Sequence, residues 1–531
     1  MLTHLSIIIE SLVSDFLNLR PAIPQDPLWA FNEFAGADFN DLRLTERLQY
    51  LARDFERQPM ASIPQACGNW AASKAAYRFW SNPKVSFHGI LAPHSANTIE
   101  RAGYDSSKVI LCPQDTTTLN YMAHPATQGL GHVGTKPGRS LGMLLHSTLA
   151  VSPEGRFHGI VGAHCWARPK PKKKSKRSGG KKKNIQEKET ARWLESYRNI
   201  ERLAQLHPQY HWVSVADREG DIYEVIREAT APKHLANLLV RARHDRSILG
   251  QSGMTLFKHV SKHPTAGNYV VHLPRDQNRA ARDATLRVGF DLVSFESPGN
   301  HAKEAPITLW VVWAREINPP AGVEPIFWCL LSTAPVRTLA DAIERIKWYV
   351  KRWVIEEFHR VLKSGCKVEE RQLTTRERLE RSLALDMVVA WRIMDINRAA
   401  RLEPQAAADQ WLCTQEWQAL YCYVNKTAVV PKEVPSIFQT VGWIAQLGGF
   451  LGRKCDGHPG DTTLWRGIHR LNDIVRSWET FGPERQSIPL TQNGLINRKD
   501  VGNAQLLNCV PVPSLEYPLR RGPPFANPAF A

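Results

Sequence analysis

The sequence predicts a protein of the α/β class, with helical regions on both sides of a core that contains strands. Helical periodicity dominates from Trp29 to about Gly103 and returns after Arg376. Short apolar runs of β character, bounded by turn residues, fill the middle of the chain. With 531 residues, the chain exceeds one ordinary domain and can bury a large core.

The same patterns divide the chain into parts. An extension at 1–28 ends in a Pro-rich stretch, and a helical N-terminal domain is expected at 29–103. A catalytic core is expected at 104–369, followed by a helical C-terminal region at 370–484. The tail at 485–531 is rich in Pro and Asn, and we expect it to be disordered.

Within the core, two strands each lead to an aspartate. Val109 to Cys112 runs into Asp115, and the strand from His211 to Ala216 is followed by Asp217. The other expected core elements are strands at 141–151 and 156–162, helices at 186–206 and 221–229, a β-rich insertion at about 238–333, and one long helix at 338–364 with Thr338 as its N-cap. Further helices are expected at 376–401, 406–424, 435–448 and 464–481.

Charge and cysteine usage limit the class of protein. Lys and Arg outnumber Asp and Glu by 68 to 51, which suits a polyanionic partner, although ribosomal or membrane-surface binding would fit as well. Residues 168–183 hold ten Lys/Arg and no acid, so we expect a mobile basic loop that either touches DNA or is solvated. The nine cysteines form no zinc-type spacing, and we find neither a signal peptide nor a membrane span, which predicts a cytoplasmic protein.

The stretch from Tyr349 to Lys363 carries the most information about function. At about 100° per residue, Tyr349, Arg352, Glu356 and Lys363 fall within about 60° of one another, and Val354, Phe358, Val361 and Leu362 lie opposite. Alone, this pattern is more typical of a solvated helix face with an Arg–Glu pair than of a functional site. Glu356 gains weight because it could complete a triad with the two strand-borne aspartates.

Three carboxylates brought together would repel one another unless cations bind between them. Hard divalent ions such as Mg²⁺ or Mn²⁺ prefer oxygen ligands. Asp115, Asp217 and Glu356 therefore predict a site for two ions about 3.5–4 Å apart, of the kind that supports in-line displacement at phosphorus. Taken singly, Asp217 in Asp-Arg-Glu-Gly-Asp is more typical of a turn or an N-cap than of a metal ligand.

With these residues in place, the chain resembles the cut-and-paste DDE transposases of bacterial insertion sequences, in the hairpin-forming group with a Tyr-Arg-Glu-Lys helix. The resemblance covers about residues 29–480. Its motifs are Trp29-Ala-Phe-Asn-Glu-Phe, Ala75-Ala-Tyr-Arg-Phe, Asp115-Thr-Thr, Asp217-Arg-Glu, Val240-Arg241, the Tyr349/Arg352/Glu356/Lys363 helix, and Trp443-Ile-Ala-Gln-Leu-Gly-Gly-Phe.

The resemblance implies an RNase H-like core, a mixed sheet flanked by helices, in which Asp115, Asp217 and Glu356 bind two Mg²⁺ ions, with Mn²⁺ as a substitute. It implies nicking at terminal inverted repeats, a hairpin intermediate, and joining to target DNA by a homodimer that pairs two ends. It assigns DNA contacts to Tyr349, Arg352, Lys363, Trp328, Arg78 and Arg241, with Trp328 stacking on a flipped base.

Other interpretations stay open at this stage. Arg43 and Arg47 either read the terminal repeat from a helix or are ordinary exposed charges. Without the resemblance, Trp328 fits a core aromatic better than a stacking residue. A standalone RNase H-like nuclease would cut without joining, and a repressor of transposition would bind DNA without cutting. The intact triad favours a catalyst. We expect this protein to be associated with the nucleoid when it is bound to DNA.

Overall fold

The structure is a computed structural model that describes residues 29–134, 140–169, 189–273, 281–453 and 456–482. The expected extension at 1–28, the expected tail at 485–531 and nearly all of the basic loop at 168–183 lie outside the described residues. The described residues all belong to one compact unit within Met1–Gly482. Within them, no helix combines the length and apolar character needed to cross a membrane.

The N-terminal part is helical, as predicted. Its helices are α2 (Trp29–Glu33), α3 (Leu42–Arg57), α4 (Ile63–Cys67), α5 (Trp70–Ser81) and α6 (Phe87–Gly103). Side chains of Asp41 and Asn69 accept backbone N–H groups at the starts of α3 and α5, which fixes where these helices begin. Buried Glu33 ties α2 to α6 through His94 and Arg101, with Oε2 2.7 Å from Arg101 Nη1.

The centre of the fold is one large mixed sheet. Its strands are β1 (Val109–Asn120), β2 (Gly131–His132), β3 (Leu141–Val151), β4 (Phe157–Trp166), β5 (His211–Ala216), β6 (Asn237–Arg241), β7 (Gly267–Leu273), β8 (Arg282–Phe295), β9 (Ile307–Glu316) and β10 (Phe327–Ser332). The order is β2-β3-β1-β5-β6-β10-β9-β8-β7, and β4 also pairs with β3. β3 runs antiparallel to β1 and β4, whereas β1, β5 and β6 run parallel to one another. An α/β protein with a mixed sheet is therefore observed.

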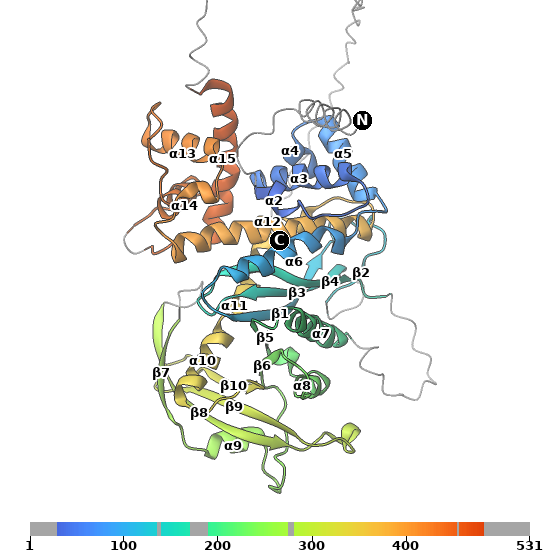
Figure 1. Ribbon diagram of the computed structural model, residues 1–531, viewed down its shortest axis with the longest axis vertical. Helices are drawn as coiled ribbons and strands as arrows, with labels where there is room; N and C mark the ends of the chain where they lie inside the picture. Colours follow the sequence, from blue (N-terminus) through green and yellow to red (C-terminus); the bar gives the residue numbers. More distant parts are fainter. Residues whose placement is uncertain (1–28, 135–139, 170–188, 274–280, 454–455, 483–531) are drawn as a thin grey trace, which may run out of the picture. The chain divides into compact units, whose positions relative to one another are not determined.

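The β-rich insertion expected at about 238–333 forms, with strands β6 to β10, and it is part of the central sheet. β10 pairs with β6, so β9, β8 and β7 extend the central sheet through antiparallel ladders. A helix that the sequence analysis did not predict, α9 (Leu256–Lys262), lies beside β8 and β9 (Figure 1). The insertion is continuous with the core sheet because its last strand, β10, pairs with β6.

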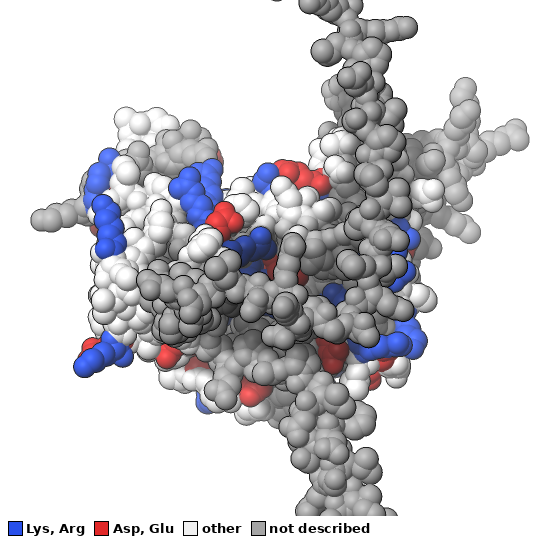
Figure 2. Space-filling model, turned by 90° about the horizontal axis from the view of Figure 1, so that it is seen from above, with Lys and Arg blue, Asp and Glu red and all other residues white. Residues whose placement is uncertain are grey.

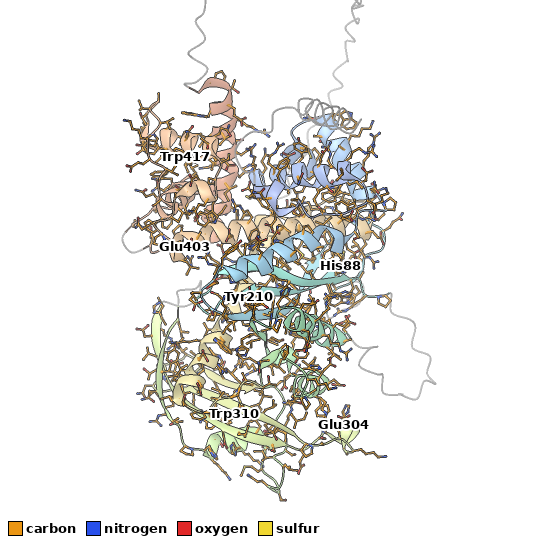
Figure 3. All side chains as sticks on the ribbon, viewed as in Figure 1. His88, Tyr210, Glu304, Trp310, Glu403 and Trp417 are labelled. Atoms are coloured by element: carbon orange, nitrogen blue, oxygen red, sulfur yellow. The ribbon has the colours of Figure 1, made fainter. Side chains whose placement is uncertain are left out.

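Helices cover both faces of the extended sheet. α7 (Ala191–Leu206), α8 (Tyr223–Ala229) and α9 share one apolar core with the sheet. α10 (Leu339–Val350) packs on the opposite face of the insertion strands. Trp313 and Trp310 of β9 illustrate the alternation, because Trp313 belongs to the first core and Trp310 packs against the second. Trp310 is labelled in Figure 3.

The C-terminal region is also helical, and its long helix α12 (Arg376–Leu402) is almost wholly buried. α12 packs against α3, α5, α6, β4 and the last helices, so in Figure 1 it lies between helices α2 to α5 on one side and α6 with the sheet on the other. The remaining helices are α13 (Thr414–Asn425), α14 (Ile437–Leu447) and α15 (Asp461–Phe481). Seen from this end, Lys and Arg side chains form several separate groups with acidic residues between them (Figure 2).

The single helix predicted at 338–364 is wrong. Thr338 caps α10 as expected, but α10 ends at Val350, and α11 begins at Trp353 and ends at Arg360. Tight bonds from the Lys351 and Arg352 N–H groups to carbonyls three residues back separate the two helices. A π turn, Val361–Gly365, follows α11. The Lys351 ammonium donates to the Glu154 carbonyl oxygen at 3.0 Å, so a contact distant in sequence holds the break.

Candidate carboxylate site

Asp115 lies within β1, at the level where β3 places Ser147 beside it. The run from Ile110 to Gln114 is buried, whereas Asp115 is only partly buried, so its carboxylate faces the edge of the core. Its Oδ1 atom accepts the Thr116 N–H at 2.7 Å. β1 continues past Asp115 to Asn120, and pairing with β3 fixes the backbone at Asp115 on one side.

Asp217 follows directly after β5, as predicted. The parallel register pairs Pro113 with Val215, and the same offset carried two residues further sets Asp115 level with Asp217. Adjacent strands lie about 4.8 Å apart, so the two carboxylates start from neighbouring backbone positions. Asp217 also accepts the Glu219 N–H at 2.7 Å, which makes it the N-cap of a short 3-10 turn as well.

The turn after Asp217 depends on its glycine. A Cβ atom on Gly220 would lie 2.5 Å from Cβ of Ala216 and 3.1 Å from the ring of Trp193. Asp221, the second aspartate of the motif, is fully buried and accepts the N–H groups of Arg243 and His244 as well as the Arg246 guanidinium. Asp221 is therefore committed to holding the loop after β6, and Asp217 is the acid that faces Asp115.

Glu356 lies on α11, which packs against β1 and β3. The predicted apolar side of this segment is buried, including Phe358 and Val361. His359, also buried, has its Nε2 atom 3.3 Å from Ser147 Oγ on β3, which anchors α11 to the strand beside β1. The Glu356 side chain stays 38% exposed, so it is accessible at the edge of the site.

The pKa of Asp115 depends on the charges of the other two acids. Burial raises the pKa of Asp115 to about 6, the Thr116 N–H opposes this rise, and the carboxylates of Asp217 and Glu356 add to it. Arg352 opposes it as the nearby cation. Acids from three separate parts of the chain thus lie close enough to act on the same proton.

Arg352 is the basic residue at the centre of this group. It is 8% exposed, and its Nη2 atom donates to Glu356 Oε1 at 2.6 Å. Its guanidinium also lies over the rings of Tyr349 and Trp353, at 5.9 and 5.4 Å from their centroids. The Nε–H of Arg352 is buried and has no acceptor among the described residues. Arg352 therefore keeps an unused donor beside the acids.

The donor set has the chemistry of a site for hard divalent ions. Carboxylate oxygens are the ligands that Mg²⁺ and Mn²⁺ prefer. The three carboxylates do not, however, all lie within 4.8 Å of one another; among the described residues only His259, His263 and Asp291 do. Such spacing is too wide for one shared ion but is compatible with two ions, because the outer ligands of a two-ion site bind different ions.

The sequence analysis missed a layer of side chains that supports Asp115. Arg192 of α7 donates from Nε to Thr116 Oγ1 at 2.8 Å. Buried His146 of β3 places Nδ1 2.8 Å from the same Thr116 oxygen and Nε2 3.1 Å from Gln114 Oε1. These contacts join residues far apart in sequence, and no local pattern marks Arg192 or His146.

Trp328, Tyr349 and Arg241 lie together near the insertion. The Trp328 and Tyr349 rings meet edge to face, with centroids 5.9 Å apart. Tyr349 is 5% exposed, so the aromatic of the predicted polar face is buried. Arg241 donates from Nη2 to the Phe327 carbonyl oxygen at 2.8 Å, next to Trp328. Because Tyr349 also lies beside Arg352, this group adjoins the carboxylates.

Lys363 lies in the π turn after α11 and not on a straight continuation of the Glu356 helix. Burial lowers the pKa of Lys363, and Glu369 opposes that shift. The prediction assumed one regular helix from Tyr349 to Lys363. Lys363 therefore does not have the position relative to Glu356 that an ideal helix would give it. The break at 351–352 and the π turn both change the angular spacing that the prediction assumed.

The three N-terminal arginines predicted to contact DNA lie on α3 and α5, whereas the carboxylates lie at the sheet and on α11. Arg78 is exposed in the last turn of α5. Arg43 is also exposed, and its guanidinium is held by Asp41 at 2.9 Å. Arg47, on the same helix, lines a polar hollow together with Arg53. These three residues are thus distributed over α3 and α5.

Comparisons with known families match the two helical ends of the chain. The family described as "Transposase DNA-binding" matches residues 26–85, and the family described as "Transposase Tn5 dimerisation domain" matches residues 388–479. The three carboxylates lie outside both matches.

Among solved structures, a piggyBac transposase synaptic complex with hairpin DNA aligns at 8% identity, over 88% of this chain and 83% of that one. Its TM-score of 0.33 is too low to indicate a shared fold. The two family matches confirm the resemblance found in the sequence, because both helical ends of this chain are similar to transposase domains, one of them of the Tn5 kind.

Proposed function

We propose that this protein cleaves and joins DNA at transposon ends by metal-dependent phosphoryl transfer at Asp115, Asp217 and Glu356. The observation that supports it most is the convergence of acids from β1, from the end of β5 and from α11. The raised pKa of Asp115, caused first by burial and then by the other two acids, is the electrostatic sign of that convergence.

The strand order supports an RNase H-like core. β4, β3 and β1 form an antiparallel series, and β5 and β6 continue it in parallel with β1. In this proposal β6 and β10 flank the point where the insertion leaves and re-enters the sheet. Asp115 then lies on the central strand of the core, and Asp217 lies on its parallel neighbour.

Two divalent ions bound by the three carboxylates would supply activation of the attacking oxygen and stabilisation of the leaving oxygen. The residues of the chain provide the rest of the site. Arg352 holds Glu356 in position, and its guanidinium adds positive charge beside the acids, where a phosphate would bind. Thr116, Arg192 and His146 fix the strand that carries Asp115.

We further propose that cleavage proceeds through a DNA hairpin. Hairpin formation requires a sharply distorted strand end, and a flipped base needs an aromatic surface on which to stack. Trp328 is only partly buried and lies against Tyr349, which adjoins Arg352. A base stacked on Trp328 would recover about 1–3 kcal/mol of the unstacking cost.

The two family matches support the partners. We propose that the N-terminal helices, with Arg78, Arg43 and Arg47, bind the terminal inverted repeats. We propose that the C-terminal helices pair two protomers, so that a homodimer holds both transposon ends. Arg241, Tyr349, Arg352 and Lys363 then contact the cleaved strand near the carboxylates.

A cleavage assay tests this function. The protein is incubated with Mg²⁺ and a labelled duplex that ends in the element's own inverted repeat, and the products are separated on a denaturing gel. Glu356→Gln should remove the nick and the hairpin while end binding persists. Glu357→Gln is the matched control, because the adjacent Glu357 is paired with Arg398 at 2.5 Å and should be dispensable for cleavage.

Other outcomes would change the assignment. Nicking that never leads to a hairpin or a joined product would indicate a nuclease. Specific binding without cleavage by the unmodified protein, in Mg²⁺ or Mn²⁺, would indicate a repressor. Equal cleavage by the Glu356→Gln and Glu357→Gln variants would show that Glu356 is not part of the catalytic site.

A further inference from the structure

A second group of potential metal ligands lies in the insertion. His259 and His263 are four residues apart at the C-terminal end of α9, a spacing that puts both imidazoles on one side of a helix. Asp291 of β8 faces them. The Nε2 atoms of His259 and His263 lie 2.9 and 3.4 Å from the same oxygen, Asp291 Oδ2. Ligand atoms of all three residues lie within 4.8 Å of one another.

These distances are close to those of a metal shell. Zn²⁺ is bound by His nitrogen and carboxylate oxygen at about 2.0–2.1 Å, so two ligands of one tetrahedral ion lie about 3.3 Å apart. The observed separations of 2.9 and 3.4 Å from Asp291 need only small side-chain movements to meet this value. Asp291 Oδ1 accepts the Leu292 N–H at 2.8 Å, which orients the carboxylate.

The surroundings hold the two imidazoles in place. Both rings stand edge-on to the indole of Trp313, with centroids 6.5 and 6.1 Å away. The indole can lie across β8 because residue 289 is glycine: a Cβ atom there would lie 2.3 Å from the Trp313 ring. Leu256 and Val260 anchor α9 in the same apolar core as Trp313. Packed side chains thus support the group on the side that faces the apolar core.

Exposure increases across the group, from 9% for the His259 side chain to 34% for Asp291 and 42% for His263. One side therefore faces solvent, where water could supply a fourth ligand. Trp313 and Trp328 lie on opposite faces of the insertion strands. The group is therefore separate from the proposed catalytic carboxylates, whose oxygen ligands suit harder ions.

We propose that His259, His263 and Asp291 form a site for a divalent transition-metal ion of the Zn²⁺ class, with water as the fourth ligand. The ion fastens the end of α9 to β8 and stabilises the insertion locally. This assignment does not depend on the transposase chemistry proposed above. Borderline ions with imidazole and carboxylate ligands fit the site better than Mg²⁺ does.

The test uses the full-length, tag-free protein and Zn²⁺ titrated in the presence of excess Mg²⁺, which occupies oxygen-only sites. We expect one Zn²⁺ per chain, and visible absorption bands of a tetrahedral ion when Co²⁺ replaces it. His263→Ala should weaken Zn²⁺ binding by about 100-fold or more. His263 is half exposed, so the variant should still fold. His272→Ala is the control, because His272 pairs with one carboxylate, that of Asp283, and among the described residues it belongs to no three-ligand group.

Amide hydrogen exchange gives a local readout. Zn²⁺ should slow exchange in α9 and the facing part of β8 for the unmodified protein and for His272→Ala, but not for His263→Ala. Equal Zn²⁺ affinity of the two variants, with no protection in α9, would mean adventitious binding only and would overturn the proposal. The absence of saturable binding in the unmodified protein would overturn it equally.

Discussion

Neutralising Asp115 should stabilise the metal-free protein at neutral pH while removing its proposed activity. Burial, reinforced by the acids of Asp217 and Glu356, raises the pKa of Asp115 from its ordinary value of 3.8 to about 6. The folded state therefore keeps the Asp115 proton at a pH where the unfolded chain has lost it. Between these two values the folded state binds more protons, so stability falls as the pH rises.

The size of the effect follows from the pKa difference. At about 1.4 kcal/mol for each pKa unit, the charged carboxylate costs up to about 3 kcal/mol above pH 6. Asp115→Asn keeps the oxygen that accepts the Thr116 N–H and removes the charge. We expect this variant to be more stable than the unmodified protein by about 1–3 kcal/mol at pH 8, and by almost nothing near pH 4.

The assay is urea unfolding followed by tryptophan fluorescence, in EDTA, at a series of pH values from 4.5 to 8. Asp341→Asn provides a control of opposite sign. N–H groups of Arg337 and Thr338 lower the pKa of Asp341, whose stabilising effect is present above its ordinary pKa and is lost as the pH falls. Neutralising Asp341 should therefore not stabilise the protein at pH 8.

Two results would refute the reasoning. One is an Asp115→Asn variant that is no more stable at pH 8 than the unmodified protein. The other is a gain that is equally large at pH 4.5, since that gain could not come from the charge of Asp115. Mg²⁺ adds a further check, because an ion that binds only the folded state should stabilise the unmodified protein more than the variant.

Three further changes have defined outcomes. Arg371→Met should lower stability by about 3–5 kcal/mol in thermal or urea unfolding, because it leaves buried Asp386 without its partner at 2.7 Å; a loss below about 1 kcal/mol would contradict this. Trp328→Ala should reduce hairpin formation more than first nicking on the denaturing gel, whereas equal losses would exclude the stacking role. Glu33→Gln should destabilise the protein at pH 7. Burial would raise the pKa of Glu33, but its bonds with His94 and Arg101 lower this pKa to about 2. The loss of stability in the variant should therefore shrink as the pH falls from 4.5 toward 2 and not remain constant.

The sequence predicted the elements that carry the acids because their signals are local. An apolar run before Asp115 and another before Asp217 indicate strands, and parallel pairing then brings the two positions level. The cap at Thr338 and the buried side of the Glu356 helix were likewise readable from residue type and spacing. Helix bounds in the C-terminal region also agree within a few residues, apart from an earlier expected start for α13.

The features that could not be predicted depend on contacts between distant segments. No Pro or Gly marks the break after Val350, which is held by Lys351 reaching the turn that contains Glu154. The insertion joins the main sheet only because β10 returns to β6. His259 and His263 have helical metal-ligand spacing, but their segment was interpreted as part of a β-rich block, and Asp291 joins them only through folding.

Arg352 shows how the site can tolerate its own charges. Three acids at one edge of the sheet destabilise the metal-free fold, and the guanidinium reduces this cost by pairing with Glu356 and lying near Asp115. The same side chain leaves its buried Nε–H without an acceptor, and an unsatisfied buried donor costs about 1–3 kcal/mol. Without bound cations the site thus carries two costs, the repulsion between its acids and the unsatisfied buried donor of Arg352.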